Sequence, residues 1–204
     1  QGAVVASVRA RFLAGLLGMQ VTDKAERDIR LRMRIVVAGA GIGGLSAALA
    51  LARSGHEVEV VERSGVIGEV GAGLQLSPNA MKGLAALGVA GAVEAVSSEP
   101  DALELRIGKS GGKVFTIPAG QAARKRYGAP YLHIHRADLV DVLKSAAESA
   151  GVKIRLDARV AAYRREPDPA GVRVGLDTGD IVWADLLVGA DGMRSTVRRL
   201  MFGA

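Results

Sequence analysis

The chain has 204 residues, of which 49% are hydrophobic, and it contains no cysteine. This length allows one good-sized domain, or one domain and part of another. The lack of cysteine excludes disulfides, thiolate metal sites and a cysteine nucleophile, and it fits the reducing cytoplasm in which we expect the protein to work. The three histidines are scattered, so no metal site is predicted. No apolar run is long enough to span a bilayer, and we expect no stable membrane insertion.

The net charge of +6 is concentrated at the start of the chain. Residues 1–34 hold seven lysines and arginines against three acids, and the rest is close to neutral. Aromatic residues, which stack on bases, make up only 3% of the chain. A nucleic-acid partner is therefore not expected.

Residues 1–32 differ in composition from the rest of the chain and are predicted to be a poorly ordered N-terminal extension. Their apolar core, Phe12–Met19, is short and is not followed by a convincing small-residue cleavage site. Met33 stands directly before the first strand-like segment. A cleaved targeting segment, an upstream extension and a misassigned start all stay open, and residues 33–204 are predicted to form the main domain.

A dinucleotide-binding pattern occupies residues 34–63. A short apolar run, 35–38, predicts a strand buried on both faces. Gly39-x-Gly41-x-x-Gly44 follows, then an apolar helical face that ends near Gly55. A second strand, 57–61, ends on Glu62. Strand, glycine turn, helix, strand and acid together predict a nucleotide site.

Each residue type in this pattern has a physical role. Gly39 permits a tight turn, Gly41 lets the backbone approach a pyrophosphate, and Gly44 lets the helix pack closely on the strand. The helix start offers free N–H groups and partial positive charge to the phosphates. Glu62 can accept both ribose hydroxyls and would repel a 2′-phosphate, so the adenosine half is predicted to be that of FAD or NAD rather than NADP.

The middle of the chain contains further predicted elements. After a glycine-dense loop, Ser77 and Pro78 begin a helix that runs to about residue 87, and a short helix follows at 90–96. Residues 103–117 read as a hairpin around Gly111-Gly112, part of a second sheet inserted at about 100–132. Residues 121–128 are basic and read as a loop.

The last third alternates strands and helices. A strand at 131–135 ends at Arg136, an amphipathic helix covers 137–150, and a strand covers 152–156. Residues 159–166, 172–177 and 181–183 predict a three-stranded antiparallel meander. The final element is a buried strand from 184, then Asp191-Gly192 and a helix start, which repeats the logic of the first motif.

Four of these segments, in this order and spacing, resemble the class A flavoprotein aromatic hydroxylases, especially the salicylate hydroxylase-like group. They are GAGIGGLSAALALARSGHEVEVVER (39–63), GAGLQLSPNA (71–80), HIHRADL (133–139) and ADLLVGADGMRSTVR (184–198). The resemblance covers nearly all of residues 33–204. It implies an α/β, Rossmann-like FAD/NAD(P)-binding domain with the antiparallel meander and part of a second, substrate-side β-sheet, truncated at its C-terminus.

The resemblance also implies which residues hold the cofactor. The glycine loop cradles the FAD pyrophosphate, Glu62 holds the adenosine ribose, the segment from Val70 to Gln75 runs along the flavin, and Arg136 reaches FAD. Asp191-Gly192 forms a second fingerprint, associated with FAD and with its nicotinamide reductant. The complete predicted set is Gly39, Gly41, Ile42, Gly43, Gly44, Glu62, Arg63, Val70, Gly71, Ala72, Gly73, Gln75, Arg136, Asp191 and Gly192.

The implied activity is hydroxylation of a phenolic or aromatic carboxylate-type substrate with NADH or NADPH and O2, with FAD as the cofactor. No catalytic side chain is predicted, and His56, His133 and His135 are interpreted as structural or incidental. The family continues to a Gly-Asp-Ala-Ala-His-like motif that this chain lacks, so we expect a fragment that cannot turn over. A homodimer is left open.

Three other functions remain open. The first is another flavoenzyme of this fold, such as an epoxidase, halogenase or reductase. The second is a nonenzymatic, truncated nucleotide-binding remnant. The third is an NAD-dependent dehydrogenase, which would leave the 71–80 and 133–139 segments unexplained.

Overall fold

A four-stranded parallel sheet forms the base of the fold, with strand order β11-β1-β2-β7. Its strands are β1 (Arg34–Ala38), β2 (Glu57–Val61), β7 (Lys153–Arg155) and β11 (Leu186–Gly189). From residue 35 to residue 38, β1 is buried, because layers of structure cover both faces of the sheet. The chain continues from β1 to β2 and β7 on one side, and it returns to pair β11 with β1 on the other.

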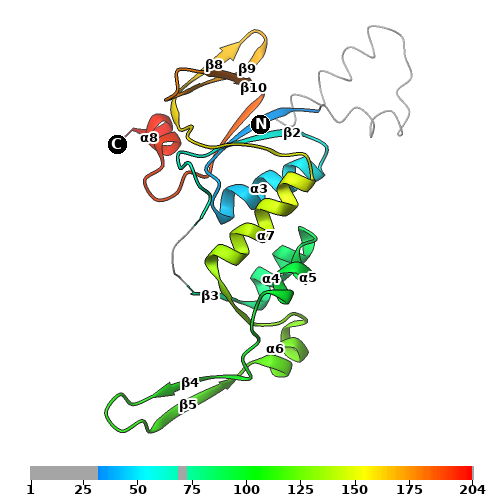
Figure 1. Ribbon diagram of the computed structural model, residues 1–204, viewed down its shortest axis with the longest axis vertical. Coiled ribbons are helices and arrows are strands. Elements are labelled where there is room, and N and C mark those ends of the chain that lie inside the picture. Colours follow the sequence, from blue (N-terminus) through cyan, green and yellow to red (C-terminus); the bar gives the residue numbers. More distant parts are fainter. Residues whose placement is uncertain (1–31, 69–72, 204) are drawn as a thin grey trace, which may run out of the picture. The chain divides into compact units, whose positions relative to one another are not determined.

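The computed structural model describes residues 32–68 and 73–203 (Figure 1). The predicted extension 1–32 therefore lies outside the described residues except for its last residue. Val70, Gly71 and Ala72 of the predicted flavin-side segment also lie outside them. From Arg34 onward the chain forms one unit.

Two helices, α3 (Ile42–Arg53) and α7 (Arg136–Ser149), pack against each other over one face of the sheet (Figure 1). α3 buries Leu45, Ala48 and Leu49, as its apolar spacing predicts. α7 buries a matching apolar face made of Leu139, Val140, Leu143 and Ala147. Ala48 and Ala147 are small, which lets the two helices approach closely.

The predicted three-stranded meander is present and shares an apolar core with the parallel sheet. It contains β8 (Val160–Pro167), β9 (Ala170–Leu176) and β10 (Ile181–Ala184), in the order β10-β9-β8. The short helix α8 (Thr196–Phe202) lies against β8. The shared buried residues are Val36, Ala38, Val61, Ala158, Val160, Val174, Leu176, Ala184 and Val197.

A smaller ribbon follows the loop after β2. β3 (Gly73–Leu76) pairs antiparallel with β6 (Leu132–His135), and α4 (Pro78–Ala86) and α5 (Ala90–Ala95) come between them in the chain. β3 contacts α4 and β6 contacts α7, and Leu76, Leu132 and Ile134 of the ribbon are buried.

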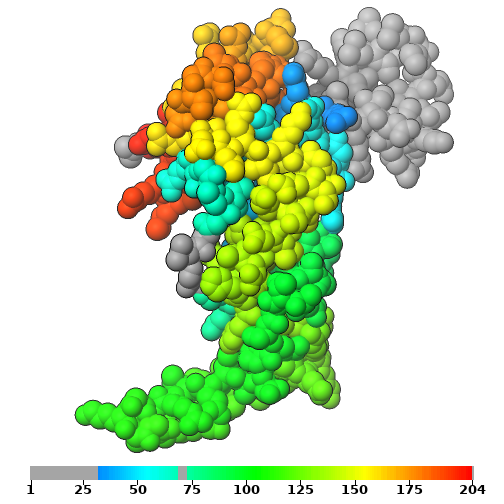
Figure 2. All heavy atoms as spheres, viewed as in Figure 1, coloured from blue at the N-terminus to red at the C-terminus, as the bar shows by residue number. Residues whose placement is uncertain are grey.

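β4 (Ala102–Arg106) and β5 (Lys113–Pro118) form the predicted hairpin, whose atoms reach away from the neighbouring helices (Figure 2). Helix α6 (Gly120–Tyr127) follows, so the prediction of a loop at 121–128 was wrong. Good helix formers occupy this segment, and Gly128 closes the helix in a left-handed conformation. Arg124 also pairs with Glu94 at 3.0 Å and Glu99 at 2.8 Å, contacts that no local pattern reveals.

None of the helices in the described part of the chain has the length and apolarity that a bilayer crossing requires.

Candidate cofactor site

The carboxyl ends of the parallel strands are joined by backbone hydrogen bonds. The N–H of Gly39 donates to Val61 O and that of Ala190 to Ala38 O, both at 2.8 Å. Glu62 N–H donates to Arg155 O at 2.8 Å. The strand order reverses between β1 and β11, and ligands of open α/β sheets bind in the crevice at such a reversal. The two predicted fingerprints, which follow β1 and β11, therefore meet at one edge of the sheet.

The glycine loop is packed too tightly for side chains at two positions. Gly39 has φ +102°, and a Cβ there would lie 2.5 Å from the carbonyl oxygen of Ala190. A Cβ on Gly44 would overlap the carbonyl oxygen of Gly39. Among the residues that the structure describes, by contrast, none outside the same helix and its adjoining residues comes within 4 Å of the position where a side chain of Gly41 or Gly43 would begin. The loop is thus closed toward the sheet and open above the helix start.

The N-terminus of α3 is available to an anion. Gly41 is its N-cap, no side chain caps it, and no acidic residue lies in its first turn. The first N–H groups of a helix have no intrahelical partner and carry partial positive charge. A pyrophosphate over the open side of Gly41 and Gly43 would satisfy them.

Glu62 is fixed by two backbone donors. Ala40 N–H donates to Glu62 Oε2 at 2.8 Å, and Ser64 N–H donates to Glu62 Oε1 at 3.0 Å. The carboxylate is half-buried, and each oxygen keeps capacity for another hydrogen bond. Glu62 therefore holds the glycine loop in place and can still accept ribose hydroxyls. Sequence reasoning missed the two donors, since any residue except proline supplies a backbone N–H.

Asp191 has a structural role that the sequence indicated only in outline. Its carboxylate accepts from the N–H groups of Thr196 at 2.6 Å and Val197 at 3.1 Å, and from the Ser195 hydroxyl at 2.5 Å. Burial acts to raise the pKa of Asp191, but the hydrogen bonds from Ser195, Val197 and Thr196 outweigh it, and the pKa lies below the ordinary value. Asp191 therefore stays ionised and holds the start of α8 against the turn at Gly192.

The other predicted residues lie on several elements. Ile42 and Gly43 lie in the first turn of α3, and Arg136 is the half-buried first residue of α7. The remaining described positions, all exposed, are Arg63, Gly73, Gln75 and Gly192.

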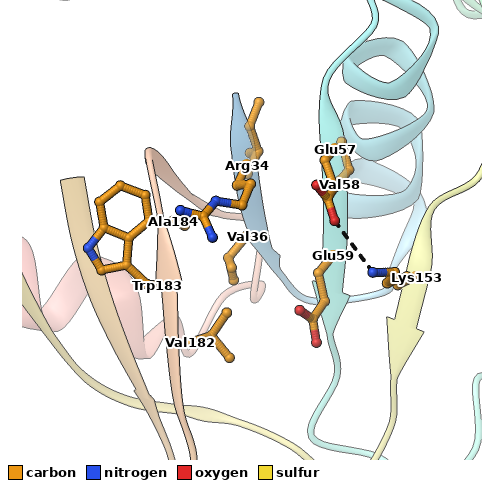
Figure 3. Close-up of a pocket in the computed structure, with 10 residues that line it drawn as sticks. Arg34, Val36, Glu57, Val58, Glu59, Lys153, Val182, Trp183 and Ala184 are labelled. Carbon is orange, nitrogen blue, oxygen red and sulfur yellow. Dashed lines mark hydrogen bonds and ion pairs between the residues drawn. The ribbon is translucent and has the colours of Figure 1, made fainter. Parts of the chain in front are cut away.

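A small pocket lies at the opposite end of the sheet, near the amino ends of β1, β2 and β7, and encloses about 50 Å³. Figure 3 shows Arg34 and Trp183 on one side and Glu57, Glu59 and Lys153 on the other. The Arg34 guanidinium lies 4.5 Å from the Trp183 ring centre, and Lys153 Nζ lies 3.4 Å from Glu57 Oε1. Its charges are balanced within the chain, so this pocket is not the candidate site.

Comparison of this chain with known protein families agrees with the geometry of the sheet edge, where the glycine loop, Glu62 and the Asp191-Gly192 fingerprint lie. The pattern of the FAD binding domain family matches residues 32–201. The chain belongs to this family. The fold class and the resemblance to flavin-dependent aromatic hydroxylases are thereby confirmed.

Two curated relatives of this FAD-binding chain illustrate the family. The chain is 41% identical over 170 residues to 3-hydroxybenzoate 6-hydroxylase 1 of Aquipseudomonas alcaligenes. The aligned region covers 83% of this chain and 43% of that relative. The chain is 40% identical over 175 residues to 3-amino-4-hydroxybenzoate 2-monooxygenase of Streptomyces cremeus. The aligned region covers 85% of this chain and 42% of that relative. The chain thus spans less than half the length of these relatives.

Solved structures give the same result. The tetrameric form of 2-methyl-3-hydroxypyridine-5-carboxylic acid oxygenase matches with a TM-score of 0.72 and 32% identity, over 84% of this chain and 43% of that one. Klebsiella pneumoniae HpxO, solved with FAD and uric acid, matches with a TM-score of 0.72 and 30% identity, over 84% of this chain and 42% of that one. The geometry of the site fits FAD, because the loop is open where a pyrophosphate would lie and Glu62 is presented beside it.

Proposed function

We propose that this chain is the dinucleotide-binding part of an FAD-dependent monooxygenase that hydroxylates a small aromatic acid with NADH or NADPH and O2. Residues 33–204 would be the FAD-binding domain, with the segment around 100–132 contributed to a substrate-side sheet. The relatives are more than twice as long as the matched region, so hydroxylation is proposed for a protein that also contains the rest of that length. We propose a cytoplasmic location, which fits the absence of cysteine.

The observation that carries the proposal is the meeting of both fingerprints at the strand reversal. The loop from Gly39 to Gly44 and the Asp191 turn are in direct contact, because Gly39 packs closely on Ala190. A single glycine-rich turn is common, whereas two fingerprints in contact across β1 and β11 mark the strand reversal where open α/β sheets bind their ligands. A site of this kind suits a dinucleotide, whose two ends need separate anchors.

The chain's own residues divide the work of holding FAD. The N–H groups at the start of α3 would bind the pyrophosphate, and Glu62 would accept hydrogen bonds from the adenosine ribose. Arg136, at the start of α7, would add positive charge. Asp191 would support the second turn through its cap on α8 rather than by direct contact. FAD, when bound, supplies the hydride acceptance and O2 chemistry that amino-acid side chains lack.

The substrate class is proposed from the names of the relatives, which act on 3-hydroxybenzoate and 3-amino-4-hydroxybenzoate. Such rings carry a carboxylate and an electron-donating hydroxyl. We propose a substrate of this class for the whole protein.

The test is the absorption spectrum of the purified chain after FAD is added and excess FAD is removed by desalting. Retained bands near about 375 and 450 nm, the usual signature of oxidised flavin, are expected. A chain that is folded by circular dichroism yet colourless after desalting, and that retains NAD instead, would contradict the proposal and favour a dehydrogenase.

A further inference from the structure

The end of β7 lies beside the end of β2, on the side away from β1. Backbone hydrogen bonds continue this pairing past both strands. Ala158 N–H donates to Glu62 O at 2.8 Å, and Asp157 N–H donates to Ser64 O at 3.3 Å. The loop after β2 and the turn after β7 are therefore neighbours at the carboxyl edge of the sheet. Starting from β1, the order along this edge is the glycine loop, Glu62 and then Asp157.

A nucleoside diphosphate fits this order in one direction. Its phosphates leave the ribose at one end of the ring, its base leaves at the other end, and the two ribose hydroxyls lie between them. With the pyrophosphate at the start of α3 and the hydroxyls on Glu62, the base is directed toward β7. Neighbouring strands lie about 4.8 Å apart, so the end of β7 is about 10 Å from the end of β1, a distance that a nucleoside diphosphate spans.

Two exposed apolar residues flank this position. Val66, in the loop after β2, is 71% exposed, and Leu156, which directly precedes Asp157, is 36% exposed. The flat face of a purine is apolar, and covering such side chains removes apolar surface from water. Binding sites for small molecules commonly combine apolar walls with a few polar groups that fix orientation. The outer end of the edge therefore offers the apolar contacts that a base requires.

The carboxylate of Asp157 supplies a polar group at the same place. A Cβ on Gly65 would lie 2.8 Å from Asp157 Oδ1, so the carboxylate rests against the bare backbone of the loop after β2. Within residues 32–68 and 73–203, no donor or cation is paired with either of its oxygens. An ionised carboxylate accepts hydrogen bonds and donates none. Both oxygens are therefore open to a donor on a ligand.

We propose that Asp157 recognises the adenine of the bound dinucleotide, and that its carboxylate accepts a hydrogen bond from the exocyclic amino group of the base. The inference rests on the proposed function and names the residue that selects the base of its cofactor. Adenine presents an amino donor where guanine presents a carbonyl oxygen, which a carboxylate repels. A hydrogen bond to a charged acceptor is also stronger than a neutral one. Asp157 is thus a specificity-determining residue of the cofactor site.

The test compares two nucleotides that differ only in the proposed donor. ADP carries the amino group, and purine riboside diphosphate carries a hydrogen atom in its place. Isothermal titration calorimetry of the purified 204-residue chain gives both dissociation constants, and their ratio is the readout. The unaltered chain should bind ADP at least about tenfold more tightly, the effect of one hydrogen bond to a charged group. General loosening of the site would weaken both nucleotides equally and leave the ratio unchanged.

Two substitutions separate the carboxylate from the backbone. Asp157 has φ +50°, a conformation that glycine and asparagine both adopt readily, so Asp157→Gly and Asp157→Asn should remain folded by circular dichroism. The ratio should fall to about one in the glycine variant, and to about threefold in the asparagine variant, which keeps a neutral acceptor. Asp168→Asn, at an exposed position between β8 and β9, removes the same charge and should keep the ratio of the unaltered chain.

Equal binding of the two nucleotides by the unaltered chain would overturn the proposal, as would no measurable binding of ADP at millimolar concentration. An unaltered ratio in the glycine variant, or an equal loss in the Asp168 control, would also overturn it. The readout needs no flavin. A chain that prefers ADP but retains NAD and no FAD would contradict the proposed function and support adenine recognition by Asp157. A chain that retains FAD but binds both nucleotides equally would do the reverse.

Discussion

Replacing Glu62 by glutamine should weaken FAD binding strongly. The carboxylate now accepts from Ala40 N–H at 2.8 Å and Ser64 N–H at 3.0 Å, and a glutamine amide can offer only one acceptor oxygen to these two donors. The substitution also removes the charge proposed to hold the ribose. A hydrogen bond to a charged group contributes about 1.5–3 kcal/mol. The dissociation constant for FAD should therefore rise by roughly 10- to 150-fold.

Quenching of FAD fluorescence on titration with protein measures that constant directly. Glu57→Gln is a matched control, because Glu57 begins the same strand and its 3.4 Å ion pair with Lys153 is exposed. Exposed pairs contribute about 0–1 kcal/mol to stability, and this pair lies at the opposite end of β2 from Glu62. The control should bind FAD normally. An unchanged dissociation constant for Glu62→Gln would refute the assignment of Glu62 to the ribose.

Three further outcomes are expected. Gly44→Ala should lower the free energy of unfolding by about 1–3 kcal/mol, because its Cβ would overlap the Gly39 carbonyl; Gly43→Ala, with open space, should be neutral in the same thermal melts. Leu143→Ala, at a fully buried position of α7, should cost about 2–5 kcal/mol in urea unfolding. Hydrogen bonds hold the pKa of Asp191 below its unfolded value, so its stabilising contribution is complete above about pH 4 and is lost as the pH falls through the lower folded pKa. Asp191→Asn should therefore flatten the acid side of the stability–pH curve, and an unchanged slope would argue against the cap.

Much of the fold can be predicted from local patterns in the sequence. The apolar run of β1, the spacing of Leu45, Ala48 and Leu49 on α3, and the turns of the meander each predicted an element that the structure contains. These elements depend on periodicity and on glycine at turns, which act over a few residues. The parallel pairing of β1 with β2 agrees with the strand, helix and strand of the first motif, because a crossover helix joins parallel strands.

The features that the sequence could not predict depend on contacts between distant residues. The basic segment of α6 was interpreted as a loop because its stabilising pairs, Arg124 with Glu94 and Glu99, join different elements. The donor from Ala40 to Glu62 is a backbone group and leaves no sequence signal.

The pairing of β1 with β11 also affects how the protein acquires its cofactor. The hydrogen bond from Arg34 N–H to the Asp185 carboxylate joins residues 151 positions apart, while β1 and β2 are separated by one helix. Contacts between distant residues form slowly, since a long loop must close first. We expect β1, α3 and β2 to assemble early during folding and β11 to pair with β1 last. FAD added to a refolding mixture should therefore slow unfolding more than it speeds folding, because the nucleotide binds a site that is finished only when the last parallel strand has docked.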